Sequence, residues 1–133
     1  GDDFTGSAAT LEVMAFAGLR ATLFVDLPTS EQLSEFTDVQ GIGIATTSRS
    51  QTPEWMAEHL PRYFEFLRNQ KVSTAHYKVC STLDSAPHVG SIGRAIDIAQ
   101  NTFHSRHVPV LIAAPKMRRY QAFGKIFIFV NIN

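Results

Sequence analysis

The stretch Thr74–Ser85, with the sequence TAHYKVCSTLDS, indicates both the fold class and the place of a site. Its first part is β-prone and predicts a strand over Thr74–Val79. Its second part is polar and predicts a loop, after which a helical pattern begins at Ser91. In an open α/β sheet, ligands bind beyond the carboxyl ends of the strands. We therefore expect the polar residues of this loop to belong to a binding site.

Other strand-like runs lie on both sides of this stretch, at Ala21–Asp26, Val39–Thr47 and Val108–Ala114. Pro115–Gly124 is basic and aromatic and is expected to be a loop, and Ile126–Val130 is apolar again. Strands that alternate with helices are typical of βαβ units. The predicted fold class is α/β, with an open, mostly parallel sheet flanked by helices in a Rossmann-like three-layer arrangement.

Helical patterns fill the segments between these strands. We expect a helix after Gly1–Gly6, capped by Thr5 or Ser7 and ended by Gly18. A brief helix over Ser30–Phe36, capped by Ser30, should follow. In a third helix, Thr52 and Pro53 give a strong start, and Pro61 is expected to kink or split it. Its apolar face is formed by Trp55, Met56, Leu60, Tyr63, Phe64 and Leu67.

The composition limits the class of protein. The chain has 133 residues, enough for one domain with a buried core, and its 12 basic and 12 acidic side chains cancel. Nothing in this charge balance indicates nucleic acid as a partner. No apolar run is long enough to span a bilayer, and the start lacks a signal-peptide pattern, so we expect no membrane partner. One cysteine, Cys80, fits a reducing compartment and a cytoplasmic location.

Both ends of the chain look cut. Asp2 and Asp3 resemble the polar tip of a strand, yet no strand precedes them. The last apolar run stops without a cap or a closing helix. A parallel sheet that lacks a strand exposes an edge. We therefore expect residues 1–133 to form a single but incomplete domain, and a homodimer through the exposed edge stays open.

Polar residues gather at three predicted strand ends, in Gly1–Gly6, Thr46–Ser50 and Tyr77–Ser85. Since the carboxyl ends of parallel strands meet at one edge of a sheet, we interpret the three clusters as one site for a small, anionic, hydroxylated ligand. The candidate binding residues are Asp2, Asp3, Ser48, Arg49, Lys78, Ser81, Thr82 and Asp84.

Each candidate also has a simpler explanation. An Asp-Asp pair before a helix can merely cap it, and isolated arginines and lysines are usually solvated. Ser81 and Thr82 can bond to the turn backbone. The His104–His107 segment has too few ligands to predict a metal, and we expect no metal site. Recurrence of polar groups at successive strand ends favours the site.

The same motifs resemble those of the four-carbon acid sugar kinases. The segments that carry the resemblance are Asp2–Gly6, Ser48–Arg49, Tyr77–Thr82, Ser91–Gly93, Arg119–Tyr120 and Phe123–Gly124. The resemblance implies an N-terminal acid-sugar-binding domain of a two-domain kinase. It also implies that ATP, with Mg²⁺, binds a C-terminal domain that this chain lacks, so no cofactor-binding residues are assigned and we expect no tight cofactor binding by this chain.

Around Lys78 the sequence departs from the commoner family pattern. Cys80 stands where many members have an aspartate, and Leu83–Gly90 replaces an Arg-Gly-Asn segment. The Cys-Ser-Thr-x-Asp-Ser form is similar to that of members acting on oxo-tetronates or related branched acids. The expected partner is therefore a small sugar acid.

Phosphoryl transfer depends mainly on positioning and electrostatics. Within the resemblance, Arg49 suits the substrate carboxylate, and Lys78 suits that group or the incoming phosphate. The sugar's hydroxyl groups could form hydrogen bonds with Ser48, Ser81 and Thr82. They could also donate hydrogen bonds to the aspartates at positions 2, 3 and 84. Asp3 is the favoured general base.

Three alternative classes of function are a binding fragment, a receiver or phosphatase domain, and a dimerising scaffold. A non-catalytic sugar-acid-binding fragment is the leading alternative, since the chain is not expected to turn over alone. A receiver domain needs an aspartate where Thr47–Arg49 stands, and a phosphatase needs an Asp-x-Asp motif that Asp2–Thr5 lacks. A dimerising scaffold would use the exposed sheet edge and would not bind ligand at the strand ends.

Overall fold

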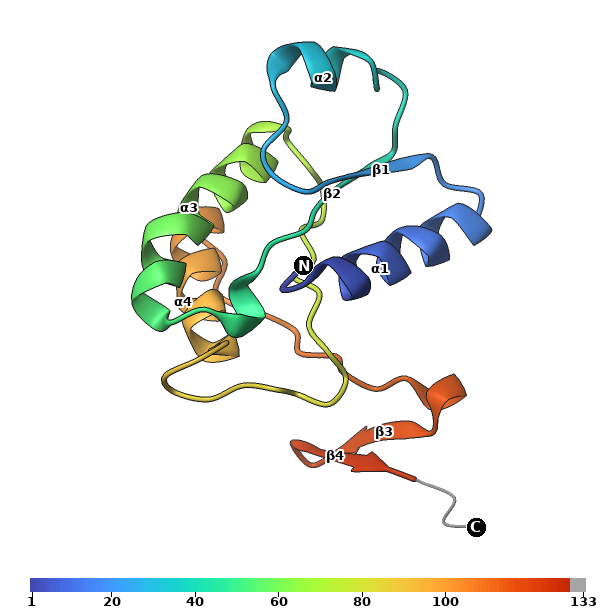
Figure 1. Ribbon diagram of the computed structural model, residues 1–133. Helices are drawn as coiled ribbons and strands as arrows, with labels where there is room; N and C mark the ends of the chain where they lie inside the picture. Colours follow the sequence, from blue (N-terminus) through green and yellow to red (C-terminus); the bar gives the residue numbers. More distant parts are fainter. Residues whose placement is uncertain (130–133) are drawn as a thin grey trace.

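The computed structural model describes residues 1–129 and shows a small α/β arrangement (Figure 1). Four α-helices, two short 3₁₀ helices and four strands follow one another within these residues. Their bounds are α1 Phe4–Phe16, β1 Ala21–Phe24, α2 Ser30–Ser34, β2 Gly41–Ile44, η1 Ser48–Ser50, α3 Pro53–Asn69, α4 Ile92–Phe103, η2 Pro115–Met117, β3 Arg119–Ala122 and β4 Lys125–Ile128. No helix in this part of the chain is long and apolar enough to cross a membrane.

The strands form two separate two-stranded sheets. β1 and β2 are parallel, with Ala21 opposite Gly41 and Phe24 opposite Ile44. β3 and β4 are antiparallel. The predicted α/β class is confirmed, but among the described residues the parallel sheet has only two strands, so a Rossmann-like three-layer arrangement is not confirmed.

Two predicted strands are wrong. Thr74–Val79 and Val108–Ala114 lie outside every strand of the described chain. A strand exists only where a neighbour completes its hydrogen-bond ladder, and the bond from the Asp2 N–H to the Lys78 carbonyl (2.9 Å) is a single such contact. Beside the second segment, the Gln121 side chain stands in for a partner strand: it accepts from the Ile112 N–H and donates to the Val110 carbonyl.

The prediction of a loop over Pro115–Gly124 is wrong in its second half, because β3 begins at Arg119. Phe123 and Gly124 both have positive φ, 50° and 69°, as a two-residue type I′ turn requires. That turn joins β3 to β4 as a hairpin. The apolar run that follows it forms β4 up to Ile128, and its last residue, Val130, lies outside the described residues.

The predicted helices are present, with corrections at their caps. α1 starts at Phe4 and is capped by Asp3, not by Thr5 or Ser7, because the Asp3 side chain accepts from the Gly6 N–H. Gly18 follows its end with φ of 80°, as expected for a left-handed terminating residue. α2 is capped by Thr29, not Ser30, in a reciprocal capping box with Gln32.

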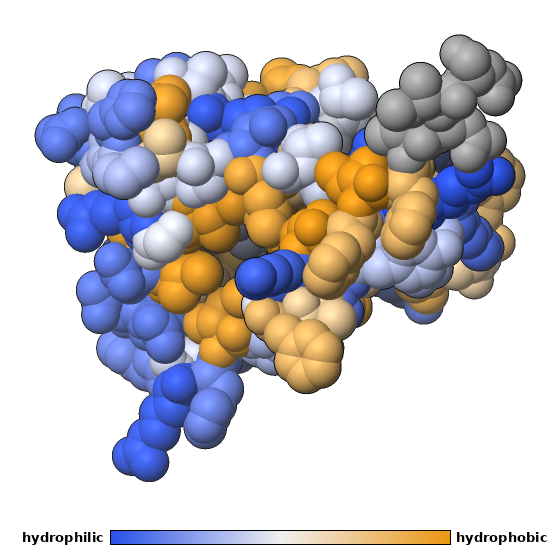
Figure 2. All heavy atoms as spheres, turned by 90° about the horizontal axis from the view of Figure 1, so that it is seen from below, coloured by the Kyte–Doolittle hydropathy of each residue, from blue (hydrophilic) through white to orange (hydrophobic). Residues whose placement is uncertain are grey.

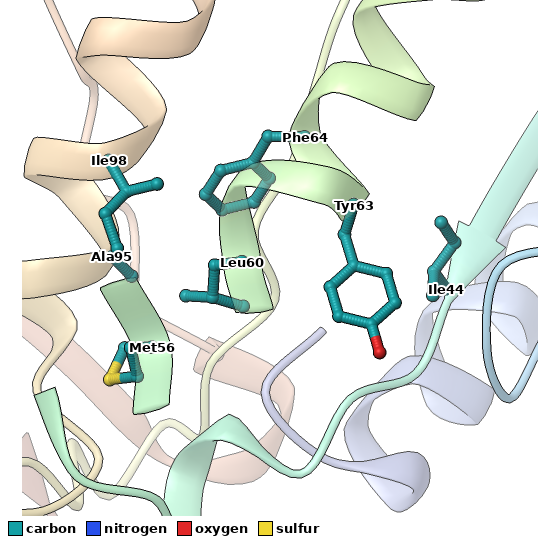
Figure 3. Packing of buried hydrophobic residues seen from close by; sticks show 7 residues of the cluster. All are labelled: Ile44, Met56, Leu60, Tyr63, Phe64, Ala95 and Ile98. Atoms are coloured by element: carbon teal, nitrogen blue, oxygen red, sulfur yellow. The ribbon is translucent and has the colours of Figure 1, made fainter. Parts of the chain in front are cut away.

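α3 starts as predicted, with Thr52 as cap and Pro53 at the first position, but it is not split at Pro61. The residues around the proline are held by the core, which outweighs the lost hydrogen bond. Met56 and Leu60 are fully buried, one turn apart on the face of α3 that packs on α4 (Figure 3). The core cluster consists of Ile44, Met56, Leu60, Tyr63, Phe64, Ala95 and Ile98.

β2 lies between two layers of helix. A side chain on Gly41 would meet Met14 of α1, whereas Ile44 joins the α3 core. Since side chains of a strand alternate between faces, α1 and α3 cover opposite faces of the sheet (Figure 1). Hydrophobic side chains are also exposed around a hollow on the face shown in Figure 2. The most exposed large ones include Val13, Phe16, Val25, Leu111 and Phe123.

Candidate functional site

The first feature of the candidate site is a buried aspartate held by an arginine. The Asp2 side chain is 5% exposed and receives two hydrogen bonds from Arg49, one from Nε to Oδ2 (3.2 Å) and one from Nη2 to Oδ1 (3.0 Å). The Arg49 N–H also donates to the Asp2 carbonyl. The hydrogen bonds between the two side chains are the largest cause of the raised pKa of Arg49. Residues 47 positions apart in the chain are thus fixed to each other.

Asp3 lies on the other side of the same guanidinium. Its Oδ2 is 2.8 Å from Arg49 Nη1, and its Oδ1 accepts from the Gly6 N–H at 2.7 Å. The simpler explanation given for this aspartate, a cap on the following helix, is therefore observed. Unlike Asp2, the Asp3 side chain is 26% exposed, so one carboxylate of the pair is accessible to a ligand.

Ser48 is completely buried in a chain of hydroxyl groups. Its Oγ is 2.7 Å from the Tyr77 hydroxyl and 2.8 Å from Thr46 Oγ1. Burial raises the pKa of Tyr77 to about 12, although the Ser48 hydrogen bond opposes this. Ser48 therefore links η1 to the segment that carries Lys78, and its hydroxyl is already used inside the protein.

Lys78 lies next to the start of α1. Its Nζ donates to the Val79 carbonyl at 2.6 Å, and it borders the position that a side chain on Gly6 would occupy. Asp3 Oδ1 borders the same position. Within residues 1–129 no ion pair is formed by this ammonium group, whereas Arg49 already holds two carboxylates.

Ser81, Thr82 and Asp84 form a second, more exposed group. Thr82 Oγ1 donates to Asp84 Oδ2 at 2.7 Å and contacts Cys80 Sγ at 3.0 Å. These Thr82 contacts are the main cause of the lowered pKa of Cys80. Ser81 Oγ accepts from Arg119 Nη1 at the start of β3.

The structure thus brings together five of the eight predicted residues: Asp2, Asp3, Ser48, Arg49 and Lys78. In the described part of the chain, no hydrogen bond or ion pair joins them to Ser81, Thr82 or Asp84. Tyr77 and Thr46 lie in two of the three clusters that the sequence predicts as one site, but neither is among the candidate binding residues. Nor did the sequence predict that Arg119 pairs with Ser81, although the basic segment around Arg119 was noted.

Gly90 is a further residue that shapes the site. It has φ of 57°, its N–H donates to the Gln51 carbonyl, and a Cβ there would overlap the backbone of Arg49. We predict that Gly90→Ala lowers the free energy of unfolding by about 2 kcal/mol, from left-handed strain plus this clash. Gly18→Ala is the matched control, since Gly18 has φ of 80° but open space around it. Chemical denaturation of both variants measures the difference, and equal losses would contradict the clash.

The amino group of Gly1 is also buried at this site, where it donates to the Ile44 carbonyl at 2.7 Å. Burial, opposed by Asp2 and Asp3, lowers the pKa of this group from 8.0 to about 6. The unfolded chain then binds more protons than the folded chain between about pH 6 and 8, so stability rises with pH across that window. We predict a gain on the order of 2 kcal/mol.

Denaturation at pH 5.5 and 8.5 measures this gain. His76 contributes in the same direction, because burial lowers its pKa too, and His76→Gln isolates its share. Acetylation of the Gly1 amine should remove the remaining dependence over this range. A pH dependence unchanged by acetylation would contradict the assignment.

No group of three or more histidine, cysteine, aspartate or glutamate side chains within residues 1–129 is arranged to hold a metal ion. The charges that meet in the first group are two carboxylates, one guanidinium and one ammonium. They lie at the N-terminal end of α1, where backbone N–H groups and the helix dipole favour an anion.

Comparison with known proteins identifies the family of this chain. Residues 1–132 match a family described as the sugar-binding N-terminal domain. The chain belongs to this family. This sugar-binding domain is 44% identical, over 131 residues, to a 3-oxo-isoapionate kinase from Paraburkholderia graminis. The aligned part covers 98% of this chain and 28% of that kinase.

Two 3-oxo-tetronate kinases are also similar to this sugar-binding domain. The one from Pseudomonas savastanoi pv. phaseolicola is 30% identical and the one from Pseudomonas fluorescens 28%. Each alignment covers 96% of this chain and 29% of the relative. The chain thus spans less than a third of the length of these kinases. No solved structure is significantly similar to it.

Proposed function

We propose that this chain is the acid-sugar-binding part of an ATP-dependent kinase that phosphorylates a four-carbon sugar acid, either a tetronate, an oxo-tetronate or a related branched acid. The observation that carries the proposal is that Asp3 and Lys78 both border the open position beside Gly6, at the N-terminal end of α1. The family and the names of its similar kinases support the same class of ligand.

Lys78 is the cation best suited to the ligand. Arg49 directs three of its five N–H donors at Asp2 and Asp3, so its charge is already neutralised inside the protein. Lys78 Nζ donates to a neutral carbonyl, and because an ammonium group has three donors, a carboxylate or phosphate could pair with its charge as well. We therefore assign Lys78 to the anionic group of the substrate, and Arg49 to holding Asp2 and Asp3 in place.

Asp3 is the proposed general base. It is the more exposed of the two aspartates, and Arg49 and the Gly6 N–H fix its orientation. A carboxylate in this position can orient the attacking hydroxyl and accept its proton as the phosphoryl group transfers. Asp2 is too buried to act this way and serves to position Arg49.

We propose that the substrate's hydroxyl groups form hydrogen bonds with Ser81, Thr82 and Asp84. Thr82 and Asp84 are already oriented by their mutual bond, and Asp84 keeps a second oxygen for a sugar hydroxyl. Ser48 is hydrogen-bonded to Thr46 and Tyr77. We propose that it helps to position Lys78, the residue after Tyr77.

We propose that ATP, with its Mg²⁺, binds elsewhere in the full-length kinase. In that protein the parallel sheet would have more strands and three layers, since helices already cover both of its faces here. The isolated chain would then bind the sugar acid without turning it over.

The rate at which the full-length enzyme forms ADP from ATP tests the proposal. Four-carbon 3-oxo sugar acids, their reduced tetronates and the corresponding uncharged sugars should be supplied with ATP. We expect turnover with at least one of the acids and none with the uncharged sugars, and no turnover by the isolated chain. Turnover of the uncharged sugars alone would contradict the acid-binding role.

A further inference from the structure

Arg119, at the start of β3, is a cation to which the proposed function gives no role. Its Nη1 donates a hydrogen bond to Ser81 Oγ, which lies 38 positions earlier in the chain. Its Nε is closed off from solvent and has no hydrogen-bond partner within residues 1–129. The ion pairs in this part of the chain all involve other cations. A partly buried guanidinium with an unsatisfied N–H is costly, so its presence here requires a physical reason.

The backbone on each side of this contact is held in place. Arg119 exchanges two backbone hydrogen bonds with Ala114 (3.0 and 3.2 Å) and begins the β3–β4 hairpin. Ser81 lies inside a turn that the Leu83 N–H closes by donating to the Cys80 carbonyl (3.0 Å). The hairpin lies beside the loop that contains this turn (Figure 1). The two side chains therefore meet between two fixed pieces of backbone.

The direction of the hydrogen bond determines what Ser81 can offer to a ligand. A guanidinium carries only donors, so the Ser81 oxygen is the acceptor. The hydroxyl keeps its own hydrogen, which forms no hydrogen bond within residues 1–129. Because linked hydrogen bonds polarise one another, a cation behind the oxygen makes this O–H a stronger donor. Ser81 is partly exposed, so its O–H is accessible to a ligand.

The neighbours of Ser81 have the opposite polarity. Thr82 donates its hydroxyl hydrogen to Asp84 Oδ2 (2.7 Å), which leaves the Thr82 oxygen as an acceptor. Asp84, as a carboxylate, only accepts. Both residues are exposed. The loop thus presents one donor, at Ser81, beside two acceptors, and only the donor has a positive charge behind it.

We propose that Arg119 is a positioning residue that holds Ser81 as the hydrogen-bond donor to an acceptor-only oxygen of the substrate, either a carboxylate oxygen or a keto oxygen. Such an oxygen has no hydrogen of its own, so it matches a hydroxyl donor that is backed by a cation. The sugar's hydroxyl groups, which also donate, match Thr82 and Asp84. The inference rests on the proposed function and refines its assignment of Ser81.

Steady-state kinetics of the full-length enzyme test this role, with ATP and either a four-carbon 3-oxo sugar acid or its reduced tetronate. Arg119→Met and Ser81→Ala should each raise the KM of the acid at least about tenfold, as expected for loss of a charge-assisted hydrogen bond. Both should change kcat and the KM of ATP less than about threefold, because the lost interaction binds the substrate without reacting. Lys125→Met, an exposed cation of the same hairpin, is the matched control and should change neither KM. An unchanged KM of the acid in the Ser81 and Arg119 variants would overturn the inference.

Ser81→Asp separates this role from a merely structural tie between the hairpin and the loop. An aspartate accepts from Arg119 as serine does, but when ionised it has no hydrogen to donate. We therefore expect Ser81→Asp to raise the KM of the acid at least as much as Ser81→Ala, with a Tm no lower than that of Ser81→Ala. A KM of the acid at the parent value in Ser81→Asp would mean that only the tie matters, and the inference would be wrong.

The two substrates distinguish the two kinds of oxygen. A KM increase in Ser81→Ala that is larger for the oxo acid than for the tetronate assigns the keto oxygen to Ser81, and equal increases assign the carboxylate. If the parent enzyme turns over no sugar acid, the proposed function fails and this inference fails with it. Turnover by the parent, with the KM of the acid unchanged in Ser81→Ala and Arg119→Met, overturns this inference alone.

Discussion

Replacing Asp3 with asparagine in the full-length enzyme is expected to lower kcat about 10²- to 10⁴-fold, the usual contribution of a general base. Asparagine caps a helix about as well as aspartate, so α1 keeps its N-terminal hydrogen bond to Gly6. Only the charge and the proton-accepting capacity are lost. The ion pair with Arg49 is partly exposed and contributes about 1 kcal/mol or less to stability.

Initial rates and thermal unfolding, measured on the same preparations, separate catalysis from folding. Asp38→Asn is the matched control, because Asp38 forms an exposed ion pair with Arg20 far along the chain from the candidate site. We expect kcat to fall for the Asp3 variant alone, with both Tm values within a few degrees of the parent. An unchanged kcat would show that Asp3 is only a cap.

Replacing Arg49 with glutamine is expected to lower the free energy of unfolding by about 3 kcal/mol. The change leaves the Asp2 carboxylate, 5% exposed, without its two hydrogen bonds. Removal of one partner from a buried pair typically costs about 3 to 5 kcal/mol, and the 27% exposure of Arg49 places this case at the lower end. Urea denaturation of the 133-residue chain measures the loss.

Arg20→Gln is the control for Arg49→Gln, since the Arg20–Asp38 side chains are 63% and 73% exposed and their pair should contribute less than about 1 kcal/mol. Adding Asp2→Asn to Arg49→Gln should restore part of the loss, because no buried charge is then left unpaired. A double variant as unstable as the sum of the two single variants would mean that the two residues act independently.

Local signals in the sequence were sufficient for the helices. Thr52–Pro53 and Ser91 mark the starts of α3 and α4, and α4 carries Ser91 as its cap. Where the predicted cap was wrong, a competing side chain one to four residues earlier took the role, as Asp3 did for α1. The split that Pro61 allowed did not occur, because the residues around it are held by core packing, which a propensity argument does not include.

Strands were harder to predict, because a strand depends on a neighbour that its own sequence does not specify. Thr74–Val79 has a strand-like sequence, but the described chain offers it only the backbone of Asp2. β3 was missed because its residues read as basic and aromatic loop, whereas the Phe123–Gly124 turn lets them pair with β4.

The sequence predicted correctly that the polar residues of the first two clusters lie close together. Asp2, Asp3 and Arg49 do meet, but as an internal ion-pair network, which the spacing of the motifs could not distinguish from a ligand-binding cluster. Tyr77 belongs to the predicted cluster Tyr77–Ser85, but no role was predicted for it, because its contact with Ser48 depends on the fold and carries no local signal. The roles of these residues toward a ligand stay proposals.

The most direct test of the account is the amide spectrum of the 133-residue chain, titrated with a four-carbon 3-oxo sugar acid and, separately, with ATP. The account predicts saturable changes with the acid that centre on Asp3, Gly6 and Lys78, and none that saturate with ATP. The acid-induced changes should be lost in Lys78→Gln. Saturable ATP binding at these residues, or no response to any sugar acid by a folded chain, would contradict it.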